Sequence, residues 1–191
     1  MTLYRRHIYL YDGLDYMKRE DNMTKNIETE RLILRCFLPE DALQIHPLFC
    51  DDEAMRLVGM YPAFTKLKQT QERIGRWAGN PRRLAIVLKN SNKVIGYMAV
   101  DSREEKCEDT KELGFAINEK CRRKGYIREA VTAIQETLKM GGVKYLWACC
   151  FEENAASENF IRSMDFKFQK KGTYAAINDR TYVSLEFMKE L

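Results

Sequence analysis

The 191-residue sequence predicts a single α/β domain in which helices flank a twisted mixed sheet. Residues Glu112–Asn118 alternate large apolar side chains with small or polar ones, which is the pattern of a strand. Apolar residues then recur at three- and four-residue spacing from Ile127 to Leu138, which predicts an amphipathic helix directly after that strand. Around this unit the sequence predicts elements in the order βααβββαβαββ, or about seven strands and about four helices.

The first 25 residues stand apart from the expected domain, which occupies residues 26–191. They mix charged residues with tyrosines and show no sustained period. We expect a poorly ordered extension or an over-long start, with the true beginning at Met17 or Met23. The alternative is an arm that packs on a partner subunit or covers a site.

The N-terminal half of the domain is expected to contain one strand, two helices and a strand hairpin. Apolar alternation predicts a strand over Thr29–Arg35, and the acids around Asp41 predict a helix start that Pro47 kinks or ends. A second helix is expected over Thr65–Ala78. The hairpin strands are Leu84–Leu88 and Val94–Val100.

After the helix that begins near Ile127, the sequence predicts a strand, a short helix and two closing strands. Gly141 and Gly142 end the long helix, and Asn154 opens the short one. The closing strands are expected to be antiparallel across a loop over residues 172–180. The three strands are Tyr145–Cys150, Phe166–Gln169 and Thr181–Phe187.

Composition limits the class of protein. Hydrophobic residues at 45% and charged residues at 31% are ordinary for a soluble globular protein. The net charge of +4 is not that of a dedicated nucleic-acid binder, but it suits a protein that binds a polyanionic small molecule. No apolar run approaches the roughly 20 residues that a membrane-spanning helix needs, so no membrane partner is expected.

Cysteine usage indicates a reducing compartment. The apolar run after residues 5–7 is too short for a signal peptide, so the six cysteines are expected as free thiols and the cytoplasm as the location. No Cys-x-x-Cys pair occurs and there are only two histidines, so we expect no metal site. Cys149 and Cys150 lack an evident activating histidine, so we expect structural thiols rather than an acyl-accepting nucleophile.

A basic turn, Arg122–Gly125, separates the strand at Glu112 from the long helix. The first N–H groups of a helix have no internal partner and carry partial positive charge, so they bind anions. Gly125 permits a close backbone approach, and the cations add attraction. The alternative is a solvated turn, but cations at a helix N-terminus are unfavourable without an anion. The pattern therefore predicts a phosphate-binding turn.

The sequence Arg122-x-x-Gly125-x-Ile127, which follows Glu112-Leu-Gly-Phe115, resembles the acetyl-CoA pyrophosphate motif of the GNAT N-acetyltransferase superfamily. The family pattern is Gln/Arg-x-x-Gly-x-Gly/Ala, so Ile127 stands where the family has a small residue. The order of the expected elements is also the order in that family. The resemblance implies a GNAT fold with a mostly antiparallel sheet, acetyl-CoA as donor, CoA as product and no metal.

Two further segments resemble the ribosomal-protein N-acetyltransferase (RimJ/RimL-like) branch of that superfamily. They are the opening Glu28–Arg35 and the pair Asn154-x-x-Ser157. Ile161 and Asp165 occupy positions where many relatives have Tyr and Gly.

The resemblance also implies which residues bind the cofactor. They lie on the strand before the motif, in the turn, and at the start of the short helix: Phe115, Ala116, Ile117, Arg122, Arg123, Lys124, Gly125, Tyr126, Ile127, Asn154 and Ser157. A backbone N–H between Ala116 and Asn118 polarises the thioester carbonyl. Asn154 binds the pantetheine arm, and Ser157 protonates the leaving thiolate. The alternatives are that Asn154 is only a helix N-cap and Ser157 an ordinary first-turn residue.

Glu112 is the candidate general base. A free ammonium has a pKa near 10, so a group or water chain must remove its proton before attack. A carboxylate at the start of this strand matches the place where many relatives have one. The alternative is a strand-end charge that faces water.

These inferences predict an acetyl-CoA-dependent N-acetyltransferase in which the amine attacks directly in a ternary complex. The acceptor is a protein N-terminus or a small amine, and its pocket is expected from residues 47–80 and 172–180. Trp77 and Tyr61 are expected in the core, with that pocket as the alternative. The rival function is a non-catalytic acyl-CoA-binding or interaction module with a decayed site. A homodimer is left open.

Overall fold

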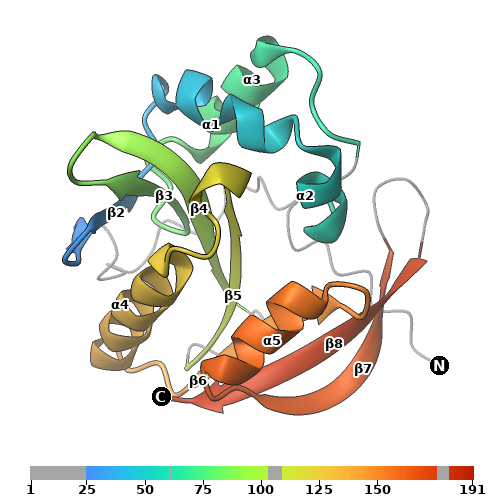
Figure 1. Ribbon diagram of the computed structural model, residues 1–191. Coiled ribbons are helices and arrows are strands. Elements are labelled where there is room, and N and C mark those ends of the chain that lie inside the picture. The colour runs from blue at the N-terminus through green and yellow to red at the C-terminus, as the bar shows by residue number, and fades with distance from the viewer. Residues whose placement is uncertain (1–24, 61, 103–108, 176–180) are drawn as a thin grey trace.

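The computed structural model describes residues 25–60, 62–102, 109–175 and 181–191 and has a mixed α/β fold (Figure 1). Tyr61 and residues 1–24 of the expected extension lie outside the described residues. No helix in these ranges is long and apolar enough to cross a membrane.

One eight-stranded sheet runs through the domain in the order β1-β2-β3-β4-β5-β6-β8-β7. Neighbouring strands are antiparallel except β5 and β6, which are parallel, so the expected mostly antiparallel sheet is confirmed. The strands are β1 (Ile27–Glu28), β2 (Leu32–Cys36), β3 (Arg83–Leu88), β4 (Lys93–Ser102), β5 (Thr110–Ile117), β6 (Tyr145–Phe151), β7 (Lys167–Ala175) and β8 (Thr181–Glu190).

Five α-helices in the described residues pack on the sheet in two groups, α1–α3 on one side and α4 with α5 on the other (Figure 1). One buried core lies between the sheet and the α4–α5 pair. The second lies under α1 and α3 and includes Phe49, Trp77 and Tyr97, so Trp77 is a core residue. The helices are α1 (Asp41–Phe49), α2 (Asp52–Leu57), α3 (Leu67–Trp77), α4 (Tyr126–Met140) and α5 (Ala155–Ser163), with a 3₁₀ turn over Glu119–Cys121.

Helix α2 is the helix that the sequence reasoning missed. The Asp51 side chain caps it by accepting a hydrogen bond from the Ala54 N–H at 2.9 Å, and two acids occupy its first turn. An acidic residue before further acids is a start signal that the sequence contains. Pro47 lies inside α1, which ends at Phe49. Helix α2 brings the number of α-helices in the described residues to five, where about four were expected.

Two strand boundaries also differ from expectation. The predicted strand Thr29–Arg35 starts later, at Leu32 in β2, and a turn separates it from the two-residue strand β1, which the sequence reasoning did not predict. Strand β7 continues to Ala175 rather than stopping at Gln169, so the first part of the expected loop is strand. The added residues belong to an edge strand and are mostly polar and exposed. They therefore lack the apolar alternation from which a strand is predicted.

The parallel strands β5 and β6 separate partway along their length. Their pairing ends at Leu113 and Ala148, although β5 continues to Ile117 and β6 to Phe151. Beyond that point β5 remains paired with β4, and β6 remains paired with β8. The sheet therefore opens between two firmly paired halves, and this opening positions the site.

Candidate active site

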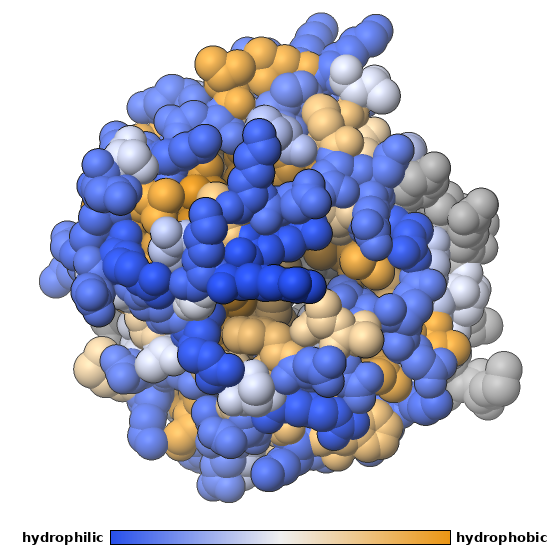
Figure 2. Space-filling model, viewed as in Figure 1, coloured by the Kyte–Doolittle hydropathy of each residue, from blue (hydrophilic) through white to orange (hydrophobic). Residues whose placement is uncertain are grey.

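A cavity of about 880 Å³ includes the opening between β5 and β6. Figure 2 shows a hollow on the face that carries α4 and α5, with apolar surface inside it and hydrophilic side chains across it. The volume is within the range of small-molecule sites. The walls come from β5 (Leu113–Ile117), the turn before α4 and its first residues (121–123 and 125–128), β6 (Cys149–Phe151), α5 and its cap (Asn154, Ala156, Ser157, Phe160), β7 (Lys170–Tyr174), β8 (Ser184, Glu186) and α2 with its C-cap (Ala54, Leu57, Val58).

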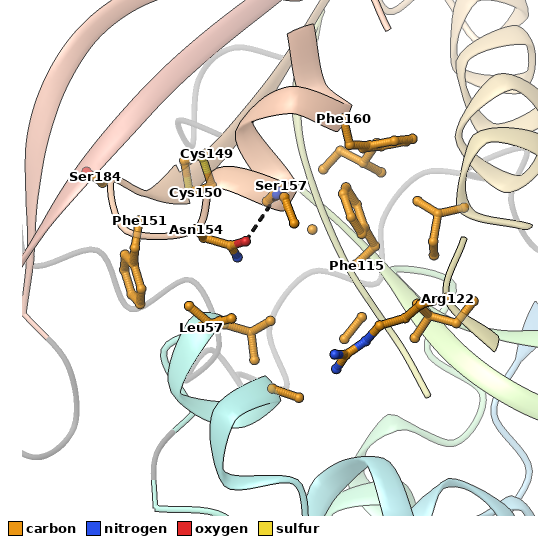
Figure 3. Close-up of a pocket in the computed structure, with 18 of the residues that line it drawn as sticks. Leu57, Phe115, Arg122, Cys149, Cys150, Phe151, Asn154, Ser157, Phe160 and Ser184 are labelled. Atoms are coloured by element: carbon orange, nitrogen blue, oxygen red, sulfur yellow. Dashed lines mark hydrogen bonds between the residues drawn. The ribbon is translucent and has the colours of Figure 1, made fainter. Parts of the chain in front are cut away.

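The cavity has two ends, as Figure 3 shows. The turn end is formed by the turn and first residues of α4, which include Arg122, together with Phe115 and Phe160. The α2 end is formed by α2, the end of β6, β7 and β8, with Leu57, Phe151 and Ser184. Asn154 and Ser157 lie between them.

The N-terminus of α4 lies at the turn end of the cavity. Gly125 is the N-cap of α4 at φ 82, and Arg123 is also left-handed at φ 60. Among the described residues no side chain caps this helix, and the Glu129 N–H donates to the Gly125 carbonyl at 3.1 Å. The N–H groups of residues 126–128 precede that bond, so they have no carbonyl partner within the helix, and these residues line the cavity. A helix N-terminus of this kind is suited to an anion.

A hydrogen-bond network braces this turn from the β1–β2 loop. Glu129 accepts hydrogen bonds from the Thr29 hydroxyl at 2.5 Å, the Arg31 N–H at 2.8 Å and the Arg31 Nε at 2.7 Å. Arg31 Nη1 donates to the Lys124 carbonyl at 3.0 Å. Burial raises the pKa of Glu129, but the bonds from Thr29 and Arg31 outweigh it and lower that pKa below its usual value. The brace fixes the path of the chain into Gly125.

At the opening, the backbone of β5 has donors available on its β6 side. The Asn118 N–H donates to the Ile95 carbonyl of β4 at 2.8 Å. Because successive residues of a strand point their N–H groups to opposite edges, those of Phe115 and Ile117 are directed away from β4, toward the opening. Within the range Ala116–Asn118, Ile117 is therefore the residue whose backbone N–H is directed toward the opening.

Asn154 and Ser157 lie side by side in the cavity wall (Figure 3). The Asn154 side-chain oxygen accepts the Ser157 N–H at 3.1 Å, so Asn154 is the N-cap of α5, which leaves its amide nitrogen as a donor for a ligand. The rings of Phe115 and Phe160 meet edge to face at 5.2 Å. After α5, Asp165 adopts φ 66, so the turn forms with Asp in place of Gly.

Helix α2 is tied to both neighbouring walls of the cavity. Arg122 of the turn approaches Asp51, the N-cap of α2, at 3.4 Å. Arg56 of α2 forms an ion pair with Glu153, which precedes α5. These pairs link α2 to the turn before α4 and to the segment before α5, and α2 contributes apolar residues to the cavity.

The α2 end is closed by Tyr174 of β7. Its ring packs against Phe151 with centroids 5.3 Å apart. A Cβ atom added to Gly59, just after α2, would lie 2.7 Å from the Tyr174 hydroxyl oxygen, so only glycine fits there. Burial, and secondarily Cys149, raise the pKa of Tyr174 to about 12, so its hydroxyl is neutral at physiological pH.

Two adjacent cysteines lie in the wall. Burial, and secondarily Glu158, raise the pKa of Cys150 to about 11, which makes that thiol a poor nucleophile. The Cys149 thiol donates to Glu112 Oε1 at 3.4 Å. Both observations fit the structural role expected for these residues.

Carboxylates are placed differently from the sequence expectation. Glu112 is only 6% exposed and lies behind Cys149 rather than in the cavity wall. Glu186 of β8, which the sequence reasoning did not select, is equally buried and does line the cavity. No group of three or more His, Cys, Asp or Glu side chains suited to a metal is found in the described part of the chain.

The structure brings together all the predicted site residues except Lys124 and Glu112 in one cavity wall. The acidic N-cap of α2 is a signal that could have predicted this helix. The helix and its C-cap contribute three wall residues that the sequence reasoning did not select, Ala54, Leu57 and Val58. Nothing local in the sequence marks Tyr174, Ser184 or Glu186, because they reach the site through the pairing of β6, β8 and β7.

Comparison with known proteins defines the class of protein to which this fold and cavity belong. Residues 31–167 match the Acetyltransferase (GNAT) domain family. The protein therefore belongs to the GNAT family of N-acetyltransferases.

Individual relatives agree with this assignment. The chain is 29% identical over 159 residues to the uncharacterized N-acetyltransferase YoaA of Bacillus subtilis, which covers 76% of this chain and 84% of YoaA. A GNAT-family acetyltransferase from Bacillus anthracis has the same fold, with a TM-score of 0.75, 20% identity, and 87% and 98% of the two chains covered. RimL, a ribosomal-protein acetyltransferase solved in complex with coenzyme A, gives a TM-score of 0.70 and 16% identity over 87% and 98% of the chains.

Proposed function

We propose that this protein transfers the acetyl group of acetyl-CoA to a primary amine that binds at the α2 end of the cavity. The observation that carries the proposal is one continuous cavity that joins an anion-binding helix N-terminus to a second, differently built pocket through the opening of the sheet. A donor with phosphates at one end and a thioester at the other suits that path.

The residues of the turn end fit coenzyme A. The N–H groups of residues 126–128 would bind the pyrophosphate, with the guanidinium groups of Arg122 and Arg123 beside it. Asn154 would bind the pantetheine arm with its amide. Ile127 lines the cavity and also packs against the core between the sheet and the α4–α5 pair. Its branched side chain can therefore pack on that core and leave the backbone N–H groups accessible to a phosphate.

Acetyl-CoA supplies a thioester carbonyl carbon for attack. The N–H groups of Phe115 and Ile117 would donate hydrogen bonds to the carbonyl oxygen as negative charge develops there. A carboxylate takes one proton from the acceptor ammonium, the nitrogen forms a C–N bond, and the C–S bond breaks. The nitrogen then loses its second proton, which reaches the thiolate with the Ser157 hydroxyl as the proposed carrier.

The first test is thermal unfolding with acetyl-CoA, with dephospho-CoA and an unrelated nucleotide as controls. Ligand at about 100 times its Kd stabilises by about 2.7 kcal/mol, which is a shift of several degrees for this chain. Release of CoA with a panel of amines then separates an enzyme from an acyl-CoA-binding module. Absence of a shift at millimolar acetyl-CoA would refute the cofactor assignment.

Two substitutions test the roles assigned from the sequence. If Glu112 is the base, Glu112→Gln should lower kcat by about 100-fold or more. If Ser157 delivers the proton to the thiolate, Ser157→Ala should lower kcat without changing acetyl-CoA affinity. Unchanged turnover in either variant removes that residue from the mechanism.

The chemical class of the acceptor amine is the second part of the proposal. The structural likeness to RimL and the Asn154-x-x-Ser157 pair favour an amine of the kind that the ribosomal-protein branch acetylates, a protein N-terminus. A small-molecule amine uses the same chemistry, and a peptide panel beside a small-amine panel distinguishes them.

A further inference from the structure

Three carboxylates are buried among the described residues, and their surroundings differ. Asp41 accepts two hydrogen bonds from the Arg35 guanidinium, at 2.6 and 2.8 Å, and is away from the cavity. Glu112 accepts the Cys149 thiol and lies behind it. Glu186 is the buried carboxylate that lines the cavity.

The strand register places Glu186 next to the opening in the sheet. It is the Cα partner of Cys149, so the two side chains share a face of the β6–β8 pair. Cys149 directly follows Ala148, the last residue of β6 that pairs with β5. A group bound on Glu186 is therefore one strand away from the position proposed for the thioester.

The Glu186 carboxylate lies against Gly172 of the edge strand β7. A Cβ atom added to Gly172 of β7 would lie 2.8 Å from Glu186 Oε1, closer than real Cβ contacts come. The carboxylate thus occupies the space that a side chain at position 172 would fill. Ser184 shares that space, since its Oγ lies 2.9 Å from the same added atom.

The wall contributed by α2 is apolar. Ala54, Leu57 and Val58 line the cavity, and Figure 3 shows Leu57 directed from α2 into it. A buried carboxylate and an aliphatic wall that line the same cavity match one kind of ligand, a primary ammonium on an apolar stem. A carboxylate beside the amine, as in a free amino acid, would be repelled by Glu186.

From this placement we infer that Glu186 binds the acceptor ammonium and takes its proton, and that the acceptor is a primary alkylamine without an adjacent carboxylate. The inference rests on the proposed acetyl transfer. In the step, the R–NH3+ group gives one proton to the Glu186 carboxylate and becomes R–NH2, the nucleophile.

The test compares two acceptors, phenethylamine, which is an ammonium at neutral pH, and p-anisidine, which is uncharged there. Glu186→Gln should lower kcat/KM for phenethylamine by about 100-fold and change that for p-anisidine little. Gly172→Ala, which displaces the carboxylate but keeps its charge, should produce a smaller loss with the same selectivity. Glu190→Gln, at the exposed end of β8, is the matched control and should leave both rates unchanged.

The outcomes are distinguishable. Equal losses for both amines, or no loss for either, would overturn the role of Glu186, and a selective loss in Glu112→Gln instead would transfer that role to Glu112. Each variant should retain the thermal shift with acetyl-CoA, which shows that it is folded. Wild-type protein that keeps this shift but acetylates no amine would overturn the proposed function and the inference with it.

Discussion

The two ends of the cavity differ in how far apart in the sequence their walls lie. The turn end is nearly continuous, from β5 through the turn into α4, with one brace from Arg31. The α2 end gathers α2, β6, β7 and β8, which meet only once the sheet is paired. The turn end therefore depends on local backbone conformation, and the α2 end depends on tertiary packing. Substitutions at one end should leave the other intact, which makes the division testable.

The largest expected effect is at the α2 end. Gly59→Ala forces the Tyr174 ring to move, because the new Cβ would lie 2.7 Å from its hydroxyl oxygen. Displacing a wall of the acceptor pocket by about 1 Å should cost about 100-fold in kcat/KM for the amine. Acetyl-CoA affinity, measured by calorimetry, should not change. Gly79→Ala is the control, since Gly79 has a similar φ of 73 and no neighbour within 4 Å of an added Cβ.

Gly125→Ala is the corresponding substitution at the turn end. Gly125 has φ 82, a conformation that costs other residues about 1–2 kcal/mol, and the new Cβ would lie 3.3 Å from Arg31 Nη2. A turn that shifts to relieve this strain misaligns the N–H groups of α4, so acetyl-CoA should bind about tenfold more weakly. If Gly79→Ala weakens binding as much, the effect is general strain and the assignment of the turn is wrong.

A smaller effect is expected where the two ends are joined. Asp51→Asn removes the charge that Arg122 meets at 3.4 Å but keeps a residue able to cap α2. The pair is partly exposed, so its loss should change the acetyl-CoA Kd and the amine KM by about fivefold at most. Larger changes in both constants would show that the ends are coupled through α2.

The smallest effect concerns the brace at the turn end and depends on pH. Because the pKa of Glu129 is lowered from 4.5 in the folded protein, its stabilising contribution is present above pH 4.5 and is lost as the pH falls through the folded value. Glu129→Gln should therefore lower the Tm by a few degrees at pH 7, and the difference from wild type should shrink below pH 4.5. A difference that does not vary with pH would contradict the role of the charge.

The comparison of the two ends explains which sequence predictions succeeded. The strand at Glu112, the turn and α4 are each specified by residues within a few positions, so periodicity and glycine placement were sufficient. The same reasoning selected Glu112 because it begins the strand, yet the register between β5 and β6 puts that carboxylate behind Cys149. Lys124 was selected by position in the motif, but the structure uses its carbonyl, as the acceptor for Arg31.

The sequence by itself determined the family, most of the order of the elements and the strand, turn and helix from Glu112 to Leu138, because hydrophobic period and helix-end chemistry act over short distances along the chain. Only the tertiary structure decided that β5 and β6 separate after Leu113, that α2 covers the cavity, and that Glu186 lines it beside Cys149. These features arise from strand register and from contacts between residues far apart in the sequence, and no local pattern encodes such pairings.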